Sequence, residues 1–284
     1  MLGALRAGRG PRVGAKSLMI HIPGYISRVP IVRGMLRLLI TAYSQIFKGR
    51  FSLERRMGLL LLLDRENAID WQLMLSGEWE RPHLTKLLDL AKQQLPHSKN
   101  GAVFLDIGAH WGLYALKARQ SGMFSQIVAF EPDPQNYAQL QANLFLNAAH
   151  TKIRALQLAA TDADRDFKLF QRNPHNRGAT RVVDVDGAGT TVVHGRRVDS
   201  LVDVSDSLLV IKIDVESHEL ETIAGMAELL SRNRFVMQIE IWDTPKEESE
   251  RRLKYLSELF AAHAAELVHS IDHDYFFAST LPRA

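Results

Sequence analysis

The chain has 284 residues, of which 46% are hydrophobic and 24% charged, and it contains no cysteine. This length and composition are typical of a globular protein with one large domain and an appendage. The lack of cysteine excludes disulfides, zinc–thiolate sites and thiolate nucleophiles, and it is compatible with a reducing compartment. We therefore expect a cytoplasmic protein.

Charge is distributed unevenly along the chain. Residues 1–60 contain eleven Lys or Arg and one acid, a net charge of +10. The remaining 224 residues contain 24 bases and 31 acids, a net charge of −7. A basic arm on an acidic body suits an anionic partner such as a membrane surface or nucleic acid. It suits docking on the chain's own acidic domain equally well.

The basic arm contains a segment, "VPIVRGMLRLLITAYSQIFKGR", with apolar residues such as Met35, Leu38 and Leu39 at helical spacing. No run in it reaches the ~18–20 uncharged apolar residues that a membrane-spanning helix needs. It could lie on a membrane surface or pack as an ordinary amphipathic helix, and the first sixteen residues also fit a targeting presequence. We expect residues 1–56 to form a partly helical basic extension, with peripheral contact to anionic membranes as a hypothesis.

From residue 57 the pattern becomes that of an alternating α/β protein. An N-terminal subdomain is expected over 57–100, containing an apolar strand and a helix near 81–95, followed by one domain over 101–284. Strands are expected at 102–107, 126–131, 152–158, 208–214, 234–241, 265–270 and 274–279, and helices at 112–121, 134–147, 217–230 and 246–263. This alternation predicts a mostly parallel seven-stranded sheet with helices on both faces. The last two strands are separated only by "IDH", which predicts a C-terminal β-hairpin with one antiparallel strand.

The stretch "VFLDIGAHWGLYALKA" indicates a ligand site. In a doubly wound sheet, ligands bind at the carboxyl ends of the strands where the strand order reverses. Asp106 ends the first strand of the domain and can accept hydrogen bonds, while Gly108 and Gly112 allow a tight turn and close approach of a ligand. Glu131 ends the next strand, 25 residues later, where an acid is placed for two ribose hydroxyls. The pattern predicts a nucleoside cofactor.

The glycine pattern also distinguishes between cofactors. A dinucleotide site expects G-x-G-x-x-G, because pyrophosphate must lie on the helix N-terminus. Here the run is D-I-G-A-H-W-G, with His110 and Trp111 in the turn and an acid in front. That acid would repel pyrophosphate but suits the aminocarboxypropyl group of S-adenosyl-L-methionine. The sequence therefore favours a methyl donor over NAD.

Five segments carry a resemblance to a known family: "FLDIGAHWGLYAL", "VAFEPDPQNYAQLQANLFLN", "LQLAATD", "RVDSL" and "LVIKIDVESHELETIAGM". They resemble FkbM-type S-adenosylmethionine-dependent methyltransferases, over about Gly101 to Trp242. The resemblance implies a class I, Rossmann-like methyltransferase fold and methyl transfer to a hydroxyl, commonly of a sugar, glycan or related small molecule. His110, Trp111 and Ser217 stand where Asn, a small aliphatic residue and Gly are usual, and these departures lie near the expected cofactor or acceptor pocket.

We expect the cofactor to be S-adenosyl-L-methionine, contacted by residues of these segments. The expected cofactor-binding residues are Asp106, Gly108, Ala109, His110, Gly112, Glu131, Pro132 and Asp162.

Methyl transfer to an alcohol needs positioning and a group that removes the proton. "KIDVESHE" places Asp214 at the end of the fourth strand, facing donor and acceptor, with Glu216 and His218 following. His218 has the ordinary pKa nearest neutrality, whereas Asp214 has the better predicted location, so these three are the expected catalytic residues. An N-cap role for Asp214 and a solvent-facing position for His218 remain alternatives. No metal is assigned, although Asp214, Glu216 and Glu240 could instead bind a divalent cation.

The segment "QRNPHNRGATRV" before the fourth strand is rich in Asn and Gly. It is interpreted either as a lid over the acceptor, with His175, Asn176 and Arg177, or as a hairpin turn.

The sequence also bears on four rival functions. A 5-methylcytosine enzyme needs a nucleophilic cysteine, which is absent, and base-amine methylation typically uses a D/N-P-P-aromatic element where this chain has "DVES". Other RNA methylation remains an alternative because of the basic arm, although nucleic acid is less favoured as a partner than a small molecule or glycan. A membrane-associated, non-catalytic scaffold with the same fold is the non-enzyme alternative.

Overall fold

The computed structural model describes residues 49–171, 176–184, 191–241 and 246–280. The amphipathic segment around Leu38 and the expected lid residue His175 therefore lie outside the described residues. Within the described ranges, no helix is long and apolar enough to cross a membrane.

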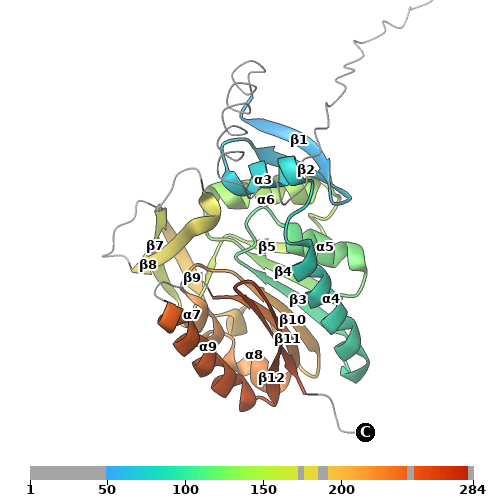
Figure 1. Cartoon of the computed structure of the whole chain (residues 1–284), viewed down its shortest axis with the longest axis vertical. Helices are drawn as coiled ribbons and strands as arrows, with labels where there is room; N and C mark the ends of the chain where they lie inside the picture. The colour runs from blue at the N-terminus through green and yellow to red at the C-terminus, as the bar shows by residue number, and fades with distance from the viewer. Residues whose placement is uncertain (1–48, 172–175, 185–190, 242–245, 281–284) are drawn as a thin grey trace, which may run out of the picture.

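A seven-stranded sheet forms the centre of the protein, with the strand order β12-β13-β11-β10-β3-β4-β5 (Figure 1). Its strands are β3 (Ala102–Ile107), β4 (Gln126–Phe130), β5 (Arg154–Leu156), β10 (Leu208–Ile213), β11 (Arg234–Glu240), β12 (Ala265–Ile271) and β13 (Asp274–Ser279). Of these, β13 runs antiparallel to both β11 and β12, while β11, β10, β3, β4 and β5 pair in parallel. The predicted class I sheet and its C-terminal hairpin are confirmed.

Helices cover both faces of this sheet, and Figure 1 shows α4 and α9 on opposite sides of it. The helices are α4 (Arg81–Gln94), α5 (Leu113–Ser121) and α6 (Pro134–Leu146) on one face, and α7 (Glu219–Ala224), α8 (Ala227–Arg232) and α9 (Lys246–Ala261) on the other. Alternate residues of β3 divide accordingly: Phe104 packs with the first set, and Leu105 and Ile107 with the second. The strands are buried on both faces because each side chain meets one of the two helical layers.

The helix expected over 217–230 is two short helices, α7 and α8. Gly225 follows α7 and lies so close to the backbone of Thr161 that a Cβ would come within 1.9 Å of its carbonyl oxygen. This approach of two backbones coincides with the break between the helices.

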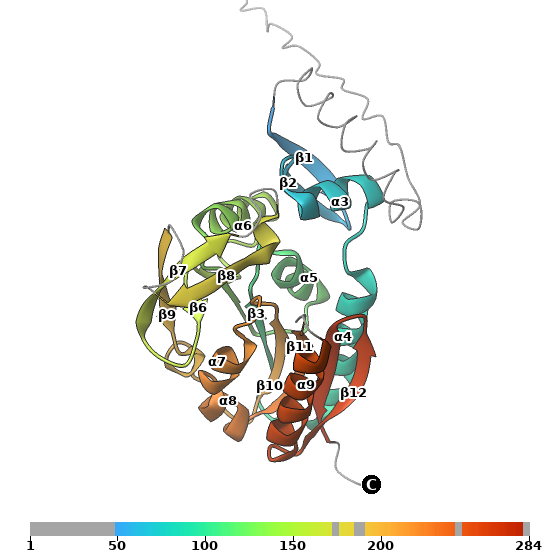
Figure 2. The same cartoon turned by 60° about the vertical axis from the view of Figure 1, so that its left-hand side comes forward.

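A second, four-stranded sheet was not predicted. It has the order β6-β9-β7-β8 and consists of β6 (Ala159–Ala160), β7 (Arg165–Gln171), β8 (Thr180–Asp184) and β9 (Thr191–Arg196). Figure 2 shows it between α6 and α7. Because β7 and β8 pair antiparallel, the segment interpreted as a lid or a hairpin turn connects two hairpin strands. Three short 3-10 helices, η1 (Leu95–His97), η2 (Arg177–Ala179) and η3 (Val198–Ser200), complete the described elements.

An antiparallel hairpin precedes the domain. Its strands β1 (Phe51–Arg56) and β2 (Leu59–Asp64) pair along their whole length and are followed by α3 (Ala68–Ser76). The expected boundary between residues 56 and 57 therefore falls in the turn of this hairpin. Residues 51–56 belong with the segment that follows them, because their backbone is paired with it.

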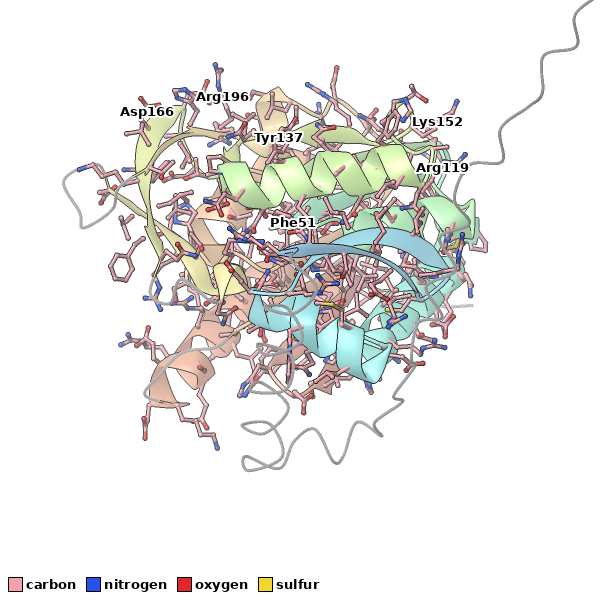
Figure 3. The ribbon with its side chains drawn as sticks, turned by 90° about the horizontal axis from the view of Figure 1, so that it is seen from above. Phe51, Arg119, Tyr137, Lys152, Asp166 and Arg196 are labelled. Atoms are coloured by element: carbon pink, nitrogen blue, oxygen red, sulfur yellow. The ribbon has the colours of Figure 1, made fainter. Side chains whose placement is uncertain are left out.

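Side chains of α6 cover the edge of β2 that β1 leaves free, and seen from above the hairpin runs alongside α6 (Figure 3). Asn147 accepts a hydrogen bond from the Leu60 amide (3.1 Å) and donates to its carbonyl (2.8 Å). Asn143 accepts from the Leu62 amide (2.7 Å), and Gln139 donates to the Leu62 carbonyl (2.9 Å). We call Gln139, Asn143 and Asn147 the amide ladder. It satisfies backbone groups that an edge strand otherwise leaves unpaired.

Arg177, just before β8, is buried and joins three parts of the chain. Its Nη1 lies 2.6 Å from Oδ2 of Asp64, while Nε donates to Asn136 (3.1 Å) and Nη2 to Gln139 (3.1 Å). Asp64 also accepts from Arg50 at 2.7 Å. Burial acts against the charge of Asp64, but the hydrogen bonds from Arg50, the following backbone and Arg177 keep its pKa below the ordinary value. The end of β2, α6 and the β7–β8 connection are thus joined by one guanidinium.

The loop after β3 makes the closest backbone approach in the central sheet. Gly108 has a φ of +78°, and a Cβ there would lie 1.8 Å from the carbonyl oxygen of Asp214, at the end of β10. Only glycine meets both conditions. Gly101, at the start of β3, has a similar φ of +74° but no atom within 4 Å of its Cβ position.

We expect Gly108→Ala to destabilise the protein by at least ~3 kcal/mol, because the left-handed backbone and the clash with Asp214 act together. Gly101→Ala, the matched control, should cost only the ~1–2 kcal/mol of the left-handed backbone. Urea unfolding of both variants measures the difference. Equal losses would mean that Asp214 moves aside at little cost.

Arg177→Met should lower the free energy of unfolding by about 3 kcal/mol, the lower part of the range for breaking a buried ion pair, because Asp64 keeps Arg50. Arg232→Met removes an arginine whose pair with Asp203 is at the surface, 3.2 Å long with Asp203 95% exposed, and should cost less than ~1 kcal/mol. The two variants are compared by urea denaturation. A loss for Arg177→Met as small as the control's would contradict the joining role.

Candidate active site

A cavity of about 370 Å³ opens at the carboxyl ends of the central strands, where the strand order reverses between β3 and β10. This is where doubly wound sheets bind ligands. Eight of the residues expected from the sequence line it: Gly108, Ala109, His110, Glu131, Pro132, Asp214, Glu216 and His218. The ends of three strands, β3, β4 and β10, thus bring these residues to one cavity.

Three expected cofactor residues do not line the cavity. Asp106 is buried beneath the loop, where its Oδ2 accepts a hydrogen bond from the Ala115 amide (2.8 Å) at the start of α5. Its Oδ1 is buried and has no partner among the described residues. Gly112 precedes α5 with a φ of +92°. Asp162 is partly exposed and accepts a hydrogen bond from the Thr161 hydroxyl at 3.1 Å.

Glu131 connects the loops that follow β3 and β4. Its Oε2 accepts a hydrogen bond from the His110 amide (2.7 Å) and its Oε1 from the Asp133 amide (3.0 Å). Burial raises the pKa of Glu131 to about 7. The carboxylate keeps further lone pairs that can accept hydrogen bonds from a ligand in the cavity.

His110 occupies the second left-handed position of the loop, with a φ of +50°. Burial, together with the charge of Arg177, lowers its pKa to about 3, so the ring is neutral. Its Nε2 lies 3.2 Å from the side-chain amide of Asn67, at the start of α3. A neutral ring accepts this bond, which attaches the loop to the segment after the N-terminal hairpin.

Lys212 lies on β10 and is buried at the floor of the site. Its Nζ is 2.9 Å from Oδ2 of Asp214 and 3.3 Å from the carbonyl oxygen of Gly108. Burial would lower its pKa, but the carboxylates of Asp214, Asp106 and Glu80 raise it above the ordinary value. Lys212 is therefore a permanent cation. It lies between the end of β10 and the loop that follows β3, residues 108–112, which we call the glycine loop.

Acids outnumber bases around Lys212. The charge of Asp214, followed by burial, raises the pKa of Glu240 to about 10, so Glu240 is protonated at neutral pH and shares a hydrogen bond with Asp214. Burial opposes the charge of Asp214 as well, yet Lys212 keeps its pKa below the ordinary value. Glu80 accepts a hydrogen bond from the Tyr114 hydroxyl at 2.9 Å, and burial raises its pKa.

Glu216 stands on a strained turn that follows β10. Its φ is +51° and that of Ser217 is +73°, values that are uncommon outside glycine. Burial and the charge of Asp214 raise the pKa of Glu216 to about 7. The left-handed backbone explains why glycine is the usual residue at the position of Ser217.

His218 is buried, so the structure does not place it in solvent. Its Nε2 lies 3.0 Å from the Thr161 hydroxyl, and its ring meets Phe167 edge to face at 5.5 Å. Burial lowers its pKa, which favours the neutral ring at pH 7.

Lys212, Glu80 and Tyr114 were missed by the sequence analysis. Lys212 had a signal, because it is the one charged residue in the strand "LLVIKI" and a buried charge needs a partner. Glu80 and Tyr114 had none, since their places in the site depend on how α4 and α5 pack. Among the described residues, no three His, Asp or Glu side chains are grouped as a metal site requires.

The residues present fit S-adenosyl-L-methionine. Glu131 lines the cavity and offers acceptors for a ribose diol. Trp111 lines the cavity with a buried Nε1 that has no partner among the described residues, a donor suited to a carboxylate. The lining therefore offers partners for the ribose and the carboxylate of the ligand.

Comparison with known proteins agrees with this assignment. Residues 106–275 match the model of the family described as Methyltransferase FkbM domain. A curated relative, the hexuronic acid methyltransferase AglP of Haloferax volcanii, is 27% identical over 162 residues. That alignment covers 56% of this chain and 64% of AglP, so the chain spans less than two thirds of that relative's length.

Two solved structures illustrate the similarity of fold. The human methyltransferase 10 domain containing protein has 12% identity and a TM-score of 0.45, covering 87% of this chain and 95% of that one. TYW2 of M. jannaschii in complex with AdoMet has 13% identity and a TM-score of 0.40, covering 81% and 87%. Likenesses at this level carry no argument about function.

The family match covers more than half of the chain and includes the glycine loop, Glu131 and the segment after β10. The chain therefore belongs to the FkbM methyltransferase family.

Proposed function

We propose that the protein transfers a methyl group to a hydroxyl of a sugar, glycan or related small molecule. The observation that carries this proposal is the set of carboxyl groups, Asp214, Glu216 and Glu240, that lines the cavity beside the glycine loop. Carboxylates accept hydrogen bonds from hydroxyl groups and can accept their protons. The name of the relative AglP, a hexuronic acid methyltransferase, supports a sugar as the acceptor.

In this proposal the cofactor lies against the ends of β3 and β4. Glu131 accepts hydrogen bonds from the ribose, and Trp111 donates to the carboxylate, while Asp106 supports the loop from beneath through its bond to the Ala115 amide. The bound cofactor supplies an electrophilic methyl group on a positively charged sulfur. The backbone of Gly108 and Ala109, without large side chains, admits it close to the end of β10.

The role of the base is divided between two acids in this proposal. Asp214 is favoured by its position at a strand end, but its ion pair with Lys212 (2.9 Å) makes it a weak base. Glu216 lines the same cavity with a pKa of about 7, which suits proton transfer near neutral pH. We assign the orientation of the acceptor hydroxyl to Asp214 and acceptance of its proton to Glu216. His218 is assigned an accessory role beside them.

The function is tested by incubating the full chain with labelled S-adenosylmethionine and separate panels of sugars, glycans, lipids and RNA. Label on a sugar hydroxyl supports the proposal. Label on RNA alone would replace it with the RNA alternative. Cofactor binding with no transfer to any hydroxyl compound would favour the scaffold alternative.

Glu131→Ala should weaken S-adenosylmethionine binding by about 1–3 kcal/mol, because polar groups of the ligand and loop lose their partner. Titration calorimetry would then show an affinity about 5–150-fold lower. Asp162→Ala is the matched control, since Asp162 lies outside the cavity lining, and its affinity should be unchanged. If the control loses affinity and Glu131→Ala does not, the assignment of the two acids is reversed.

The second prediction concerns the pH profile of methyl transfer. A raised pKa means that Glu216 is protonated and inactive below about pH 7, so the rate should increase as pH rises through that value. Glu216→Gln should lose this rise together with ~10²–10⁴ in rate, whereas Asp214→Asn should lower the rate and keep the rise. His218→Ala should have an intermediate effect. A Glu216→Gln enzyme that keeps the rise and most of its turnover would return the base role to Asp214.

A further inference from the structure

Carboxyl groups outnumber basic groups in the described lining of the half of the cavity formed by the ends of β10 and β11. Asp214, Glu216, Glu240 and Glu80 all line it. Below them, Lys212 is buried and its partner Asp214 is partly buried, so these charges interact in a medium less polarisable than water. This half faces the proposed acceptor, because the cofactor is assigned to β3 and β4.

Among the residues that the structure describes, two basic side chains, Lys212 and Arg177, line the cavity, and both are engaged within the protein. Lys212 is 6% exposed and is paired with Asp214 at 2.9 Å. Arg177 is 5% exposed and uses its nitrogens for Asp64, Asn136 and Gln139. Neither is available to an incoming anion without first losing an internal partner, which is costly for a buried charge.

The remaining charged groups near Glu216 do not reverse this balance. Arg181 on β8 lowers the pKa of Glu216 and Lys212 does so weakly, but burial, Asp214 and Glu219 raise it, and the net change is upward to about 7. Arg181 is not among the residues that line the cavity. The lining histidines, His110 and His218, have lowered pKa values and contribute no positive charge at neutral pH.

The acidic groups of the cavity also oppose one another's ionisation. Asp214 carries the negative charge that Lys212 compensates, and its presence keeps Glu240 protonated. A further carboxylate or phosphate on the acceptor would place a like charge against this group. A neutral hydroxyl would instead donate hydrogen bonds to the same carboxyl oxygens.

We propose that the sugar ring which receives the methyl group carries no negative charge, so that the acceptor is a neutral polyhydroxylated ring rather than a uronic acid or sugar phosphate. This inference rests on the proposed function and specifies its substrate class.

Three matched acceptors test it: methyl β-D-glucopyranoside, methyl β-D-glucuronide and the methyl ester of that glucuronide. The ester has the size of the acid and lacks its charge. With the full chain and labelled S-adenosylmethionine, the glucoside and the ester should be methylated at similar kcat/KM, and the acid at least tenfold more slowly. The series is repeated with the galacto and manno configurations, so that the stereochemistry of the ring does not decide the result.

A pH series gives a second measurement that the size of the acceptor does not affect. The carboxylate of the glucuronide stays ionised between pH 6 and 8.5, while Glu216 loses its proton. The ratio of rates for the glucoside and the glucuronide should therefore increase with pH, although the proposed base titrates equally for both.

The outcomes separate this inference from the function on which it rests. A glucuronide methylated as well as or better than the glucoside overturns the inference and leaves sugar methylation standing. Loss of that activity in Arg181→Gln would then assign the acceptor's carboxylate to Arg181. If no sugar of any configuration is methylated while the protein binds S-adenosylmethionine, the proposed function fails and the inference falls with it.

Discussion

The backbone contact between Gly108 and Asp214 is the constraint on which the site depends. It brings the loop after β3 against the end of β10 at a separation that no side chain could occupy. Lys212 reinforces the contact from below, since its ammonium group reaches both the Gly108 carbonyl and the Asp214 carboxylate. The glycine loop and the acidic end of β10 are consequently fixed to one another, and a displacement of one moves the other.

A second set of contacts closes the cofactor side of the cavity. Arg177 joins the β7–β8 connection to Asp64 at the end of β2 and to α6. His110 joins the glycine loop to Asn67, in the link between β2 and α3. The N-terminal hairpin and the link after it are therefore connected to residues that line the cavity, although they lie before the segment that matches the family. This connection is made through buried polar contacts, which fix geometry more strictly than apolar packing does.

The sequence was sufficient for the central sheet and insufficient for the parts that depend on distant contacts. Strands β3 and β10 are apolar apart from Asp106 and Lys212, and each has an acid at or just after its end, a local signal that needs no tertiary context. The four-stranded sheet has short strands with few buried residues, among them Phe167 and Leu169, so its pattern is weak. Asp162 follows a recognisable motif, but the motif does not say to which side its carboxylate points. Lys212 and Asp214 lie at the end of β10, and their pKa values depend on the groups that the folded chain places around them. For this reason their ion pair could not be predicted from the sequence.

The amide ladder shows over what length the side chains of a helix can replace a neighbouring β-strand as hydrogen-bond partners. Four residues of an α-helix advance about 6 Å along its axis, and two residues of a strand advance about 6.8 Å. Each repeat of the ladder therefore falls behind the strand by about 0.8 Å, which is more than the usual spread of hydrogen-bond lengths. The step from Asn143 to Asn147 matches one such step, from Leu62 to Leu60, and the flexible side chains take up the difference; a second step would double the mismatch to about 1.6 Å. The difference between the helical and the strand repeat thus limits the length of the β2 edge that side chains of α6 can hydrogen-bond.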